Sequence, residues 1–152
     1  MGTPIKVDLG ADLSNQYQIV TILRTPLYPG FKELCPASFQ PEDLLPLSLP
    51  GQLETHPEYG ANVLRELIKD EFALLKRCIG IRELLAFEKM GVAFCGDYSQ
   101  GKYLVGWRDV AVNSNNFYCV PVLFTNPLKS GWAFLYQLFP GMTANLLYKK
   151  SA

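Results

Sequence analysis

Apolar positions follow different patterns in three regions of the chain, and the clearest pattern lies between residues 54 and 91. There, apolar side chains recur every three or four residues, at Leu64, Leu67, Ile68, Phe72, Leu75 and Ile79. This spacing is typical of one face of an amphipathic helix, which we expect to end near Gly80. A second helix is predicted from Ile81 to Met90, because the helical spacing resumes there and Gly91 follows as a terminator. Residues 54–91 therefore predict a helix pair.

From residue 92 onward the period shortens to that of strands. Three runs are rich in β-branched and aromatic residues: Val92–Asp97, Lys102–Val112 and Phe117–Thr125. The segments between them are rich in turn-forming residues, so the runs predict a three-stranded antiparallel meander. Pro121 cannot donate to a ladder, so the third strand is expected to lie at an edge or to carry a bulge.

The aromatic tail fits two patterns. Trp132, Leu135, Tyr136 and Phe139 have helical spacing, whereas Trp132, Phe134, Tyr136 and Leu138 alternate as in a strand. We favour a fourth strand here, followed by a turn at Pro140-Gly141 and a short helix over residues 143–149.

The N-terminal region differs from both of the others. Eight of the eleven prolines lie within residues 1–57, and proline at such intervals prevents long helices. Residues 1–53 are expected to form an irregular proline-rich wrap with one strand, Tyr17–Leu23. The whole chain, 1–152, is predicted to be a single α+β domain. In it, a helix pair (54–91) packs on a mainly antiparallel sheet of three to five strands, formed by the meander and aromatic tail (92–152).

The two faces of the predicted meander are both unusually apolar. If the second turn pairs Val112 with Phe117, one face is continuous apolar surface that would pack on the helix pair. The opposite face carries Leu104, Val110, Cys119 and Leu123, and Arg108 is its single charge. A solvated sheet face should be polar at these positions, so either the chain's own termini or a partner must cover this one. The predicted partner-binding residues are Arg108, Phe117, Leu123, Trp132 and Tyr136.

The charge balance narrows the choice of partners. The chain has 14 basic and 14 acidic residues, and this balance argues against binding to nucleic acid, which requires an excess of Lys and Arg. No apolar run approaches the roughly 20 residues of a membrane span, and no signal-peptide pattern opens the chain. The four cysteines are scattered without Cys-x-x-Cys spacing. Reduced thiols and a cytoplasmic location are therefore expected, with no metal and no cofactor.

Candidate chemistry is sparse. A thiol-dependent hydrolase or transferase would need Cys95 beside His56, with Asp97 to orient the base, because His56 is the single histidine. His56 lies within a predicted capping box formed by Thr55 and Glu58, where an exposed structural role is the commoner one. Glu83 and Glu88 are expected on a solvated helix face.

Three functional hypotheses follow. The leading one is a non-enzymatic protein-binding or adaptor domain (an inhibitor, immunity or chaperone-like protein) that uses an apolar sheet face and the aromatic tail. Its partner would be another protein or a second copy of the chain. The first alternative is the thiol enzyme described above. The second is a small-ligand pocket near Asp109, whose carboxylate falls on the apolar face and must find partners there.

Overall fold

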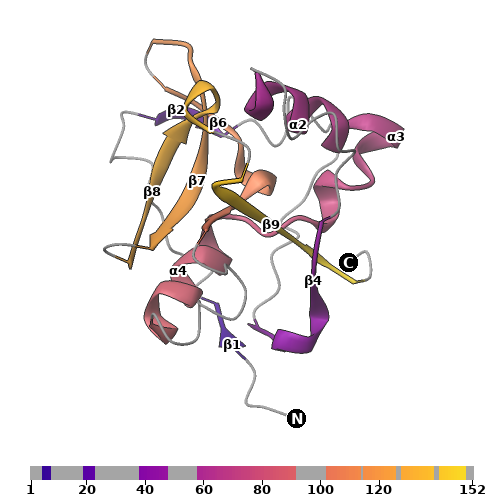
Figure 1. Cartoon of the computed structure of the whole chain (residues 1–152), viewed down its shortest axis with the longest axis vertical. Coiled ribbons are helices and arrows are strands. Elements are labelled where there is room, and N and C mark those ends of the chain that lie inside the picture. Colours follow the sequence, from indigo (N-terminus) through magenta and orange to yellow (C-terminus); the bar gives the residue numbers. More distant parts are fainter. Residues whose placement is uncertain are drawn as a thin grey trace.

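A computed structural model of the chain describes residues 5–7, 19–22, 38–47, 58–91, 102–113, 115–125, 128–138 and 141–149. Its fold is α+β, as predicted, with helices packed on a mainly antiparallel sheet (Figure 1). The predicted strand Val92–Asp97 and most of the proline-rich region lie outside the described residues. Within the described ranges, no helix is long and apolar enough to span a membrane.

The predicted long helix is broken, whereas the second helix is confirmed. The helices are α2 (Tyr59–Leu67), α3 (Lys69–Phe72) and α4 (Ile81–Met90). Asp70 has a positive φ of 52°, a conformation that Asp tolerates better than most residues and that interrupts the helical path. After a 3-10 turn over Leu75–Arg77, Cys78 is extended and bridges to Leu147. α4 ends where expected, because Gly91 adopts a φ of 93°.

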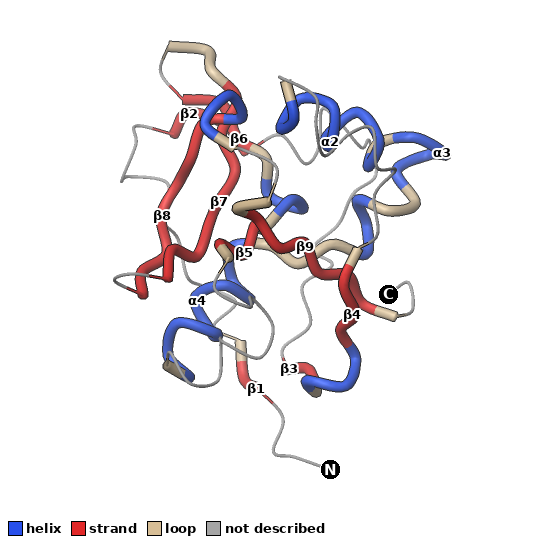
Figure 2. Tube along the Cα trace, in the orientation of Figure 1, coloured by secondary structure: helices blue, strands red, loops and turns tan. Residues whose placement is uncertain are grey.

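The sheet is built from strands throughout the chain, which Figure 2 shows in red. The strands are β1 (Ile5–Lys6), β2 (Ile19–Ile22), β3 (Ser38–Phe39), β4 (Leu44–Pro46), β5 (Tyr103–Val105), β6 (Ala111–Asn113), β7 (Tyr118–Thr125), β8 (Leu128–Phe134) and β9 (Thr143–Tyr148). Their order is β2-β6-β7-β5-β9-β4, with β8 on β7 and with β1 and β3 paired separately. The pairs are antiparallel except β5 with β9, which is parallel. β2 lies within Tyr17–Leu23, where a strand is predicted, and β4 is a further short strand of the N-terminal region.

The predicted strand Lys102–Val112 is interrupted in the middle. β5 and β6 are separated by a 3-10 helix, η5 (Trp107–Asp109), in which all three side chains are buried. β5 pairs with the second half of β7, and β6 pairs with its first half. The two short strands therefore occupy one edge of β7 in succession, and η5 fills the space between them.

Pro121 lies inside the sheet, which corrects the expectation of an edge strand. β7 pairs with β8 on one side and with β5 and β6 on the other. The carbonyl oxygen of Pro121 accepts a hydrogen bond from the Gly106 N–H at 2.8 Å. In an extended residue the N and C=O point to the same side, so the missing donor of Pro121 faces the interruption at η5. Proline is tolerated here because the ladder is already broken.

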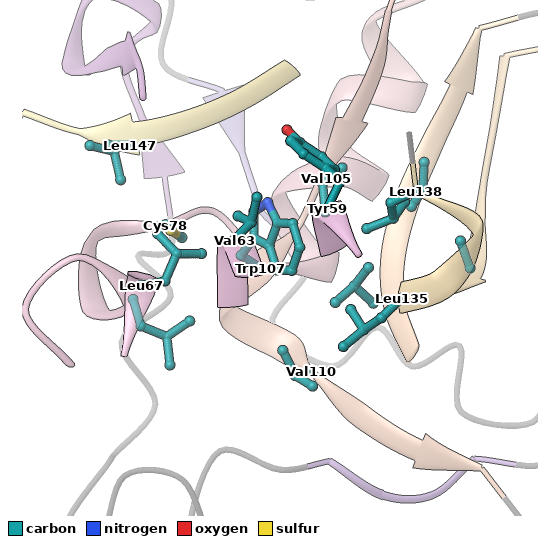
Figure 3. Close-up of a cluster of buried hydrophobic side chains, with 14 residues drawn as sticks. Tyr59, Val63, Leu67, Cys78, Val105, Trp107, Val110, Leu135, Leu138 and Leu147 are labelled. Atoms are coloured by element: carbon teal, nitrogen blue, oxygen red, sulfur yellow. The ribbon is translucent and has the colours of Figure 1, made fainter. Parts of the chain in front are cut away.

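Helices α2 and α4 cover opposite faces of the sheet, and not a single face as predicted. Val105 and Val122 pack in the cluster that contains Tyr59 and Val63 of α2, which Figure 3 shows around Trp107. The other face, formed by residues such as Leu104 and Leu123, packs against Leu84, Ala86 and Phe87 of α4 and against Ile79, which precedes that helix. The apolar second face is thus covered by α4 together with short N-terminal strands, through Ile5 and Phe39.

The second turn of the meander is one residue longer than predicted. Val112 pairs with Tyr118, and not with Phe117. Asn116 in this turn has a φ of 65°, a left-handed conformation that Asn adopts more readily than most residues. The shift leaves Phe117 outside the strand and places Tyr118 at its exposed beginning.

The aromatic tail is a strand at its start, as favoured, but the helix expected over residues 143–149 is wrong. β8 runs antiparallel to β7, and a 3-10 helix, η6 (Leu135–Gln137), follows it. Thr143–Tyr148 forms β9 between β5 and β4. Strand geometry allows Leu146 and Leu147 to enter clusters on the two opposite faces, which a helix there could not do.

Gly60 sets the distance between α2 and η6. A methyl group at this buried position would overlap the backbone carbonyl of Leu135. We expect Gly60→Ala to lower the free energy of unfolding by about 1–3 kcal/mol, because relieving the overlap requires backbone movement. Helix propensity alone predicts that the variant is more stable, since Ala favours the helical state over Gly by about 1 kcal/mol. Urea unfolding measures the difference, and a stabilised variant would contradict the close approach.

Candidate functional site

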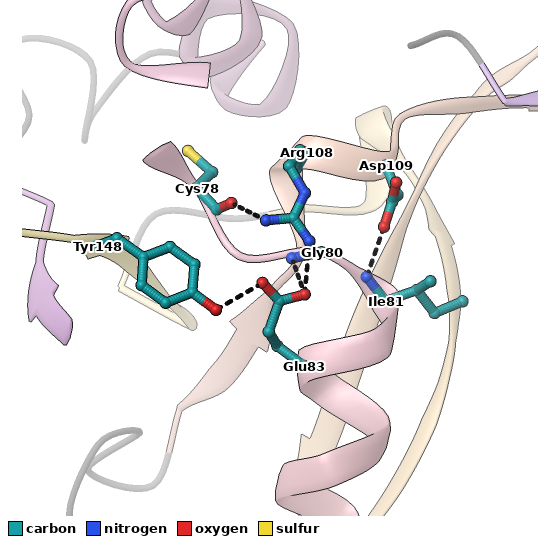
Figure 4. A network of polar contacts seen from close by, with 7 residues as sticks. All are labelled: Cys78, Gly80, Ile81, Glu83, Arg108, Asp109 and Tyr148. Carbon is teal, nitrogen blue, oxygen red and sulfur yellow. Dashed lines mark hydrogen bonds and ion pairs between the residues drawn. The ribbon is translucent and has the colours of Figure 1, made fainter. Parts of the chain in front are cut away.

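A fully buried ion pair connects α4 to the interruption in the strand. Arg108 Nη2 donates to Glu83 Oε1 at 2.6 Å, and both side chains are almost completely buried (Figure 4). The Gly80 N–H donates to the same carboxylate oxygen at 3.1 Å, and the Tyr148 hydroxyl donates to Oε2 at 2.8 Å. Arg108 Nη1 donates to the Cys78 carbonyl at 3.1 Å. These bonds offset the cost of burying both charges.

The surroundings of Glu83 stabilise its charged form. Burial by itself raises the pKa of this carboxyl, but the Arg108 charge and the hydrogen bonds from Arg108, Tyr148 and Gly80 together lower it below the ordinary value. The expectation that Glu83 lies on a solvated face is therefore wrong. The helical spacing did not reveal its partner, because Arg108 comes from another element.

Asp109 caps the same helix from outside. Its Oδ2 accepts the Ile81 N–H at 2.8 Å, at the first turn of α4, where backbone donors lack intrahelical partners. Gly80 makes this approach possible, since a methyl group there would overlap the Asp109 carboxylate. The structure thus places Asp109 in a structural contact.

The predicted partner-binding residues separate into two groups. Arg108, Leu123 and Trp132 are buried, so they do not form an accessible surface, and their expected exposure is wrong. Phe117 and Tyr136 are 52% and 69% exposed. They are brought together with Tyr118, which is 51% exposed and which the sequence assigned to the core face. Tyr118 does alternate with the buried Val120 and Val122, but it is the first residue of β7 and lies at the margin of that core.

A groove lies between these three aromatic side chains and the start of α2. It encloses about 270 Å³ and is lined by Glu58, Tyr59, Ala61, Phe117, Tyr118, Leu135, Tyr136 and Leu138. We call it the aromatic groove. Glu58 occupies the N-cap position of α2, and therefore the helix begins later than the predicted capping box. Sequence reasoning missed Tyr118 and the floor residues, because their proximity depends on tertiary packing.

The 3-10 helix η6 determines which tail residues face the groove. In 3-10 geometry, residues three apart lie on the same side, and both Leu135 and Leu138 are buried. Tyr136 then projects outward. The Gln137 side chain accepts the Phe134 N–H at 2.9 Å and closes the turn. Strand alternation alone would not produce this arrangement.

A buried chain of hydrogen bonds fixes the floor of the groove. Trp107 Nε1 donates to Asn145 Oδ1 at 2.7 Å, and Asn145 Nδ2 donates to the Tyr59 hydroxyl at 3.4 Å. The Tyr59 hydroxyl also lies 3.0 Å from Thr143 Oγ1. The first residue of α2 is therefore bonded to β9, which positions the rim contributed by α2.

The exposed rings contact one another through Phe134. Its ring makes an edge contact with Phe117 at a centroid distance of 5.9 Å and stacks on Tyr136 at 5.4 Å. Aromatic pairs in these geometries contribute about 0.5–1.5 kcal/mol beyond area burial. The part of the rim formed by Phe117 and Tyr136 is thus held in place before any ligand binds.

The groove suits part of a larger molecule better than a whole small ligand. Small-molecule sites enclose roughly 300–1,000 Å³, and this groove and a second hollow of about 260 Å³ near Tyr103 and Met142 lie just below that range. Asp109 lines neither hollow. In the described part of the chain, no group of three or more His, Cys, Asp or Glu side chains could hold a metal ion.

The residues of the thiol-enzyme hypothesis, Cys95, His56 and Asp97, lie outside the described residues. Two other cysteines, Cys78 and Cys119, are buried, and neither forms a disulfide within the described residues. Burial raises the pKa of the Cys78 thiol to about 12, although the nearby Arg108 and Arg77 charges lower it in part. Its sulfur also donates to the Leu74 carbonyl at 3.3 Å.

No protein-family model matches this sequence, and comparisons with curated proteins and with solved structures found no significant match.

The ion pair gives the first test of this region. We expect Glu83→Gln to lower the free energy of unfolding by about 3–5 kcal/mol, because the variant leaves the Arg108 charge buried without its counter-charge. The control is Glu66→Gln in the more exposed pair with Lys69, for which a change within about 0.5 kcal/mol is expected. Equal effects of the two variants would contradict the assigned role of Glu83.

We expect the destabilisation caused by Glu83→Gln to depend on pH. The folded state lowers the pKa of Glu83, so its contribution is complete above the unfolded pKa of about 4.3 and is lost as the pH falls. The difference in unfolding free energy between wild type and Glu83→Gln should therefore narrow below about pH 4. A difference that stays constant from pH 7 to pH 3 would be inconsistent with a charged Glu83.

Cys78 should be inert in the native protein. Its raised pKa keeps the thiol protonated near neutral pH, and burial excludes the reagent. Iodoacetamide labelling followed by peptide mass spectrometry should modify Cys78 only after unfolding in guanidinium. Modification of the native protein at the rate of a free thiol would show that this part of the core opens readily.

Proposed function

We propose that this chain is a non-enzymatic protein-binding domain that captures a segment of another protein in the aromatic groove. The observation that carries the proposal is the gathering of Phe117, Tyr118 and Tyr136, each more than half exposed, around one hollow. Large exposed apolar side chains usually mark interaction surfaces when they form a patch. Aromatic residues are also enriched among the few side chains that contribute most of the energy of protein interfaces.

The groove combines preformed walls with an accessible rim. Leu135, Leu138 and Tyr59 form a buried floor, and the stacked ring of Tyr136 stands at the solvent side. A partner side chain that enters the hollow would be desolvated on several sides, as anchor residues of interfaces are. Because the hydrogen bonds of Tyr59 and Gln137 already order this region, little ordering cost remains for binding.

A peptide-display selection tests the proposal. Peptides recovered on the immobilised wild-type protein should bind the Tyr136→Ser variant at least about tenfold more weakly, because the variant removes a central anchor. The matched control is Met90→Ser, which removes a side chain that is 48% exposed and lies outside the lining of the groove. Its affinity should equal that of the wild type.

Two outcomes would overturn the proposal. Peptides that bind wild type and Tyr136→Ser equally well would place binding elsewhere. Light scattering that shows a wild-type dimer, converted to monomer by Tyr136→Ser, would make a second copy of the chain the occupant of the groove. Circular dichroism of each variant confirms that it is folded, which is expected because both substituted side chains face solvent.

A further inference from the structure

We draw no further inference here: the strongest candidate, the aromatic groove with the neighbouring outer edge of β8, belongs to the site already described, and nothing in the described part of the chain shows what covers it.

Discussion

The buried pair of Arg108 and Glu83 is the constraint on which the arrangement of this protein depends. Desolvating two such charges costs several kcal/mol per ion unless each is fully bonded. The partners that complete the set come from the connection before α4 and from the end of β9. A fold that misplaced any of these segments would leave a buried charge incompletely bonded. The pair therefore fixes both where the strand breaks and where α4 begins.

The three residues of η5 lie in a single turn but bond to different elements of the fold. Arg108 and Asp109 bond to the start of α4, whereas Trp107 bonds to Asn145 and, through it, to Tyr59 of α2. The interruption of the strand thus links helices on the two opposite faces of the sheet. The rim of the aromatic groove is positioned by the same turn that buries the ion pair, although the two lie in different parts of the core.

The sequence predicted local elements well and their contacts poorly. α4 and its end at Gly91 follow from helical spacing and glycine, and the α+β class follows from the change of period. The strand break did not follow, because Trp107, Arg108 and Asp109 fit strand alternation, and only a partner 25 positions away explains the buried arginine. Within the site, Phe117 and Tyr136 were predicted. Tyr118 was missed because alternation assigns it to the buried face with Val120 and Val122, and only tertiary packing leaves the start of β7 uncovered.

Side chains of the same chain bond to the outer edge of β8. Pro121 of β7 pairs with Trp132 of β8, but the Pro121 carbonyl points the other way, toward β5. These two residues therefore form a pair without mutual hydrogen bonds, and every second residue of β8, counted from Trp132, directs its N–H away from β7. Two of these donors, on Ser130 and Phe134, are occupied by the side chains of Glu88 and Gln137. An open edge invites pairing between copies and growth into aggregates. By occupying two of these donors with its own carboxylate and amide, the chain leaves fewer backbone groups on this edge for pairing between copies, close to where its aromatic rings are exposed.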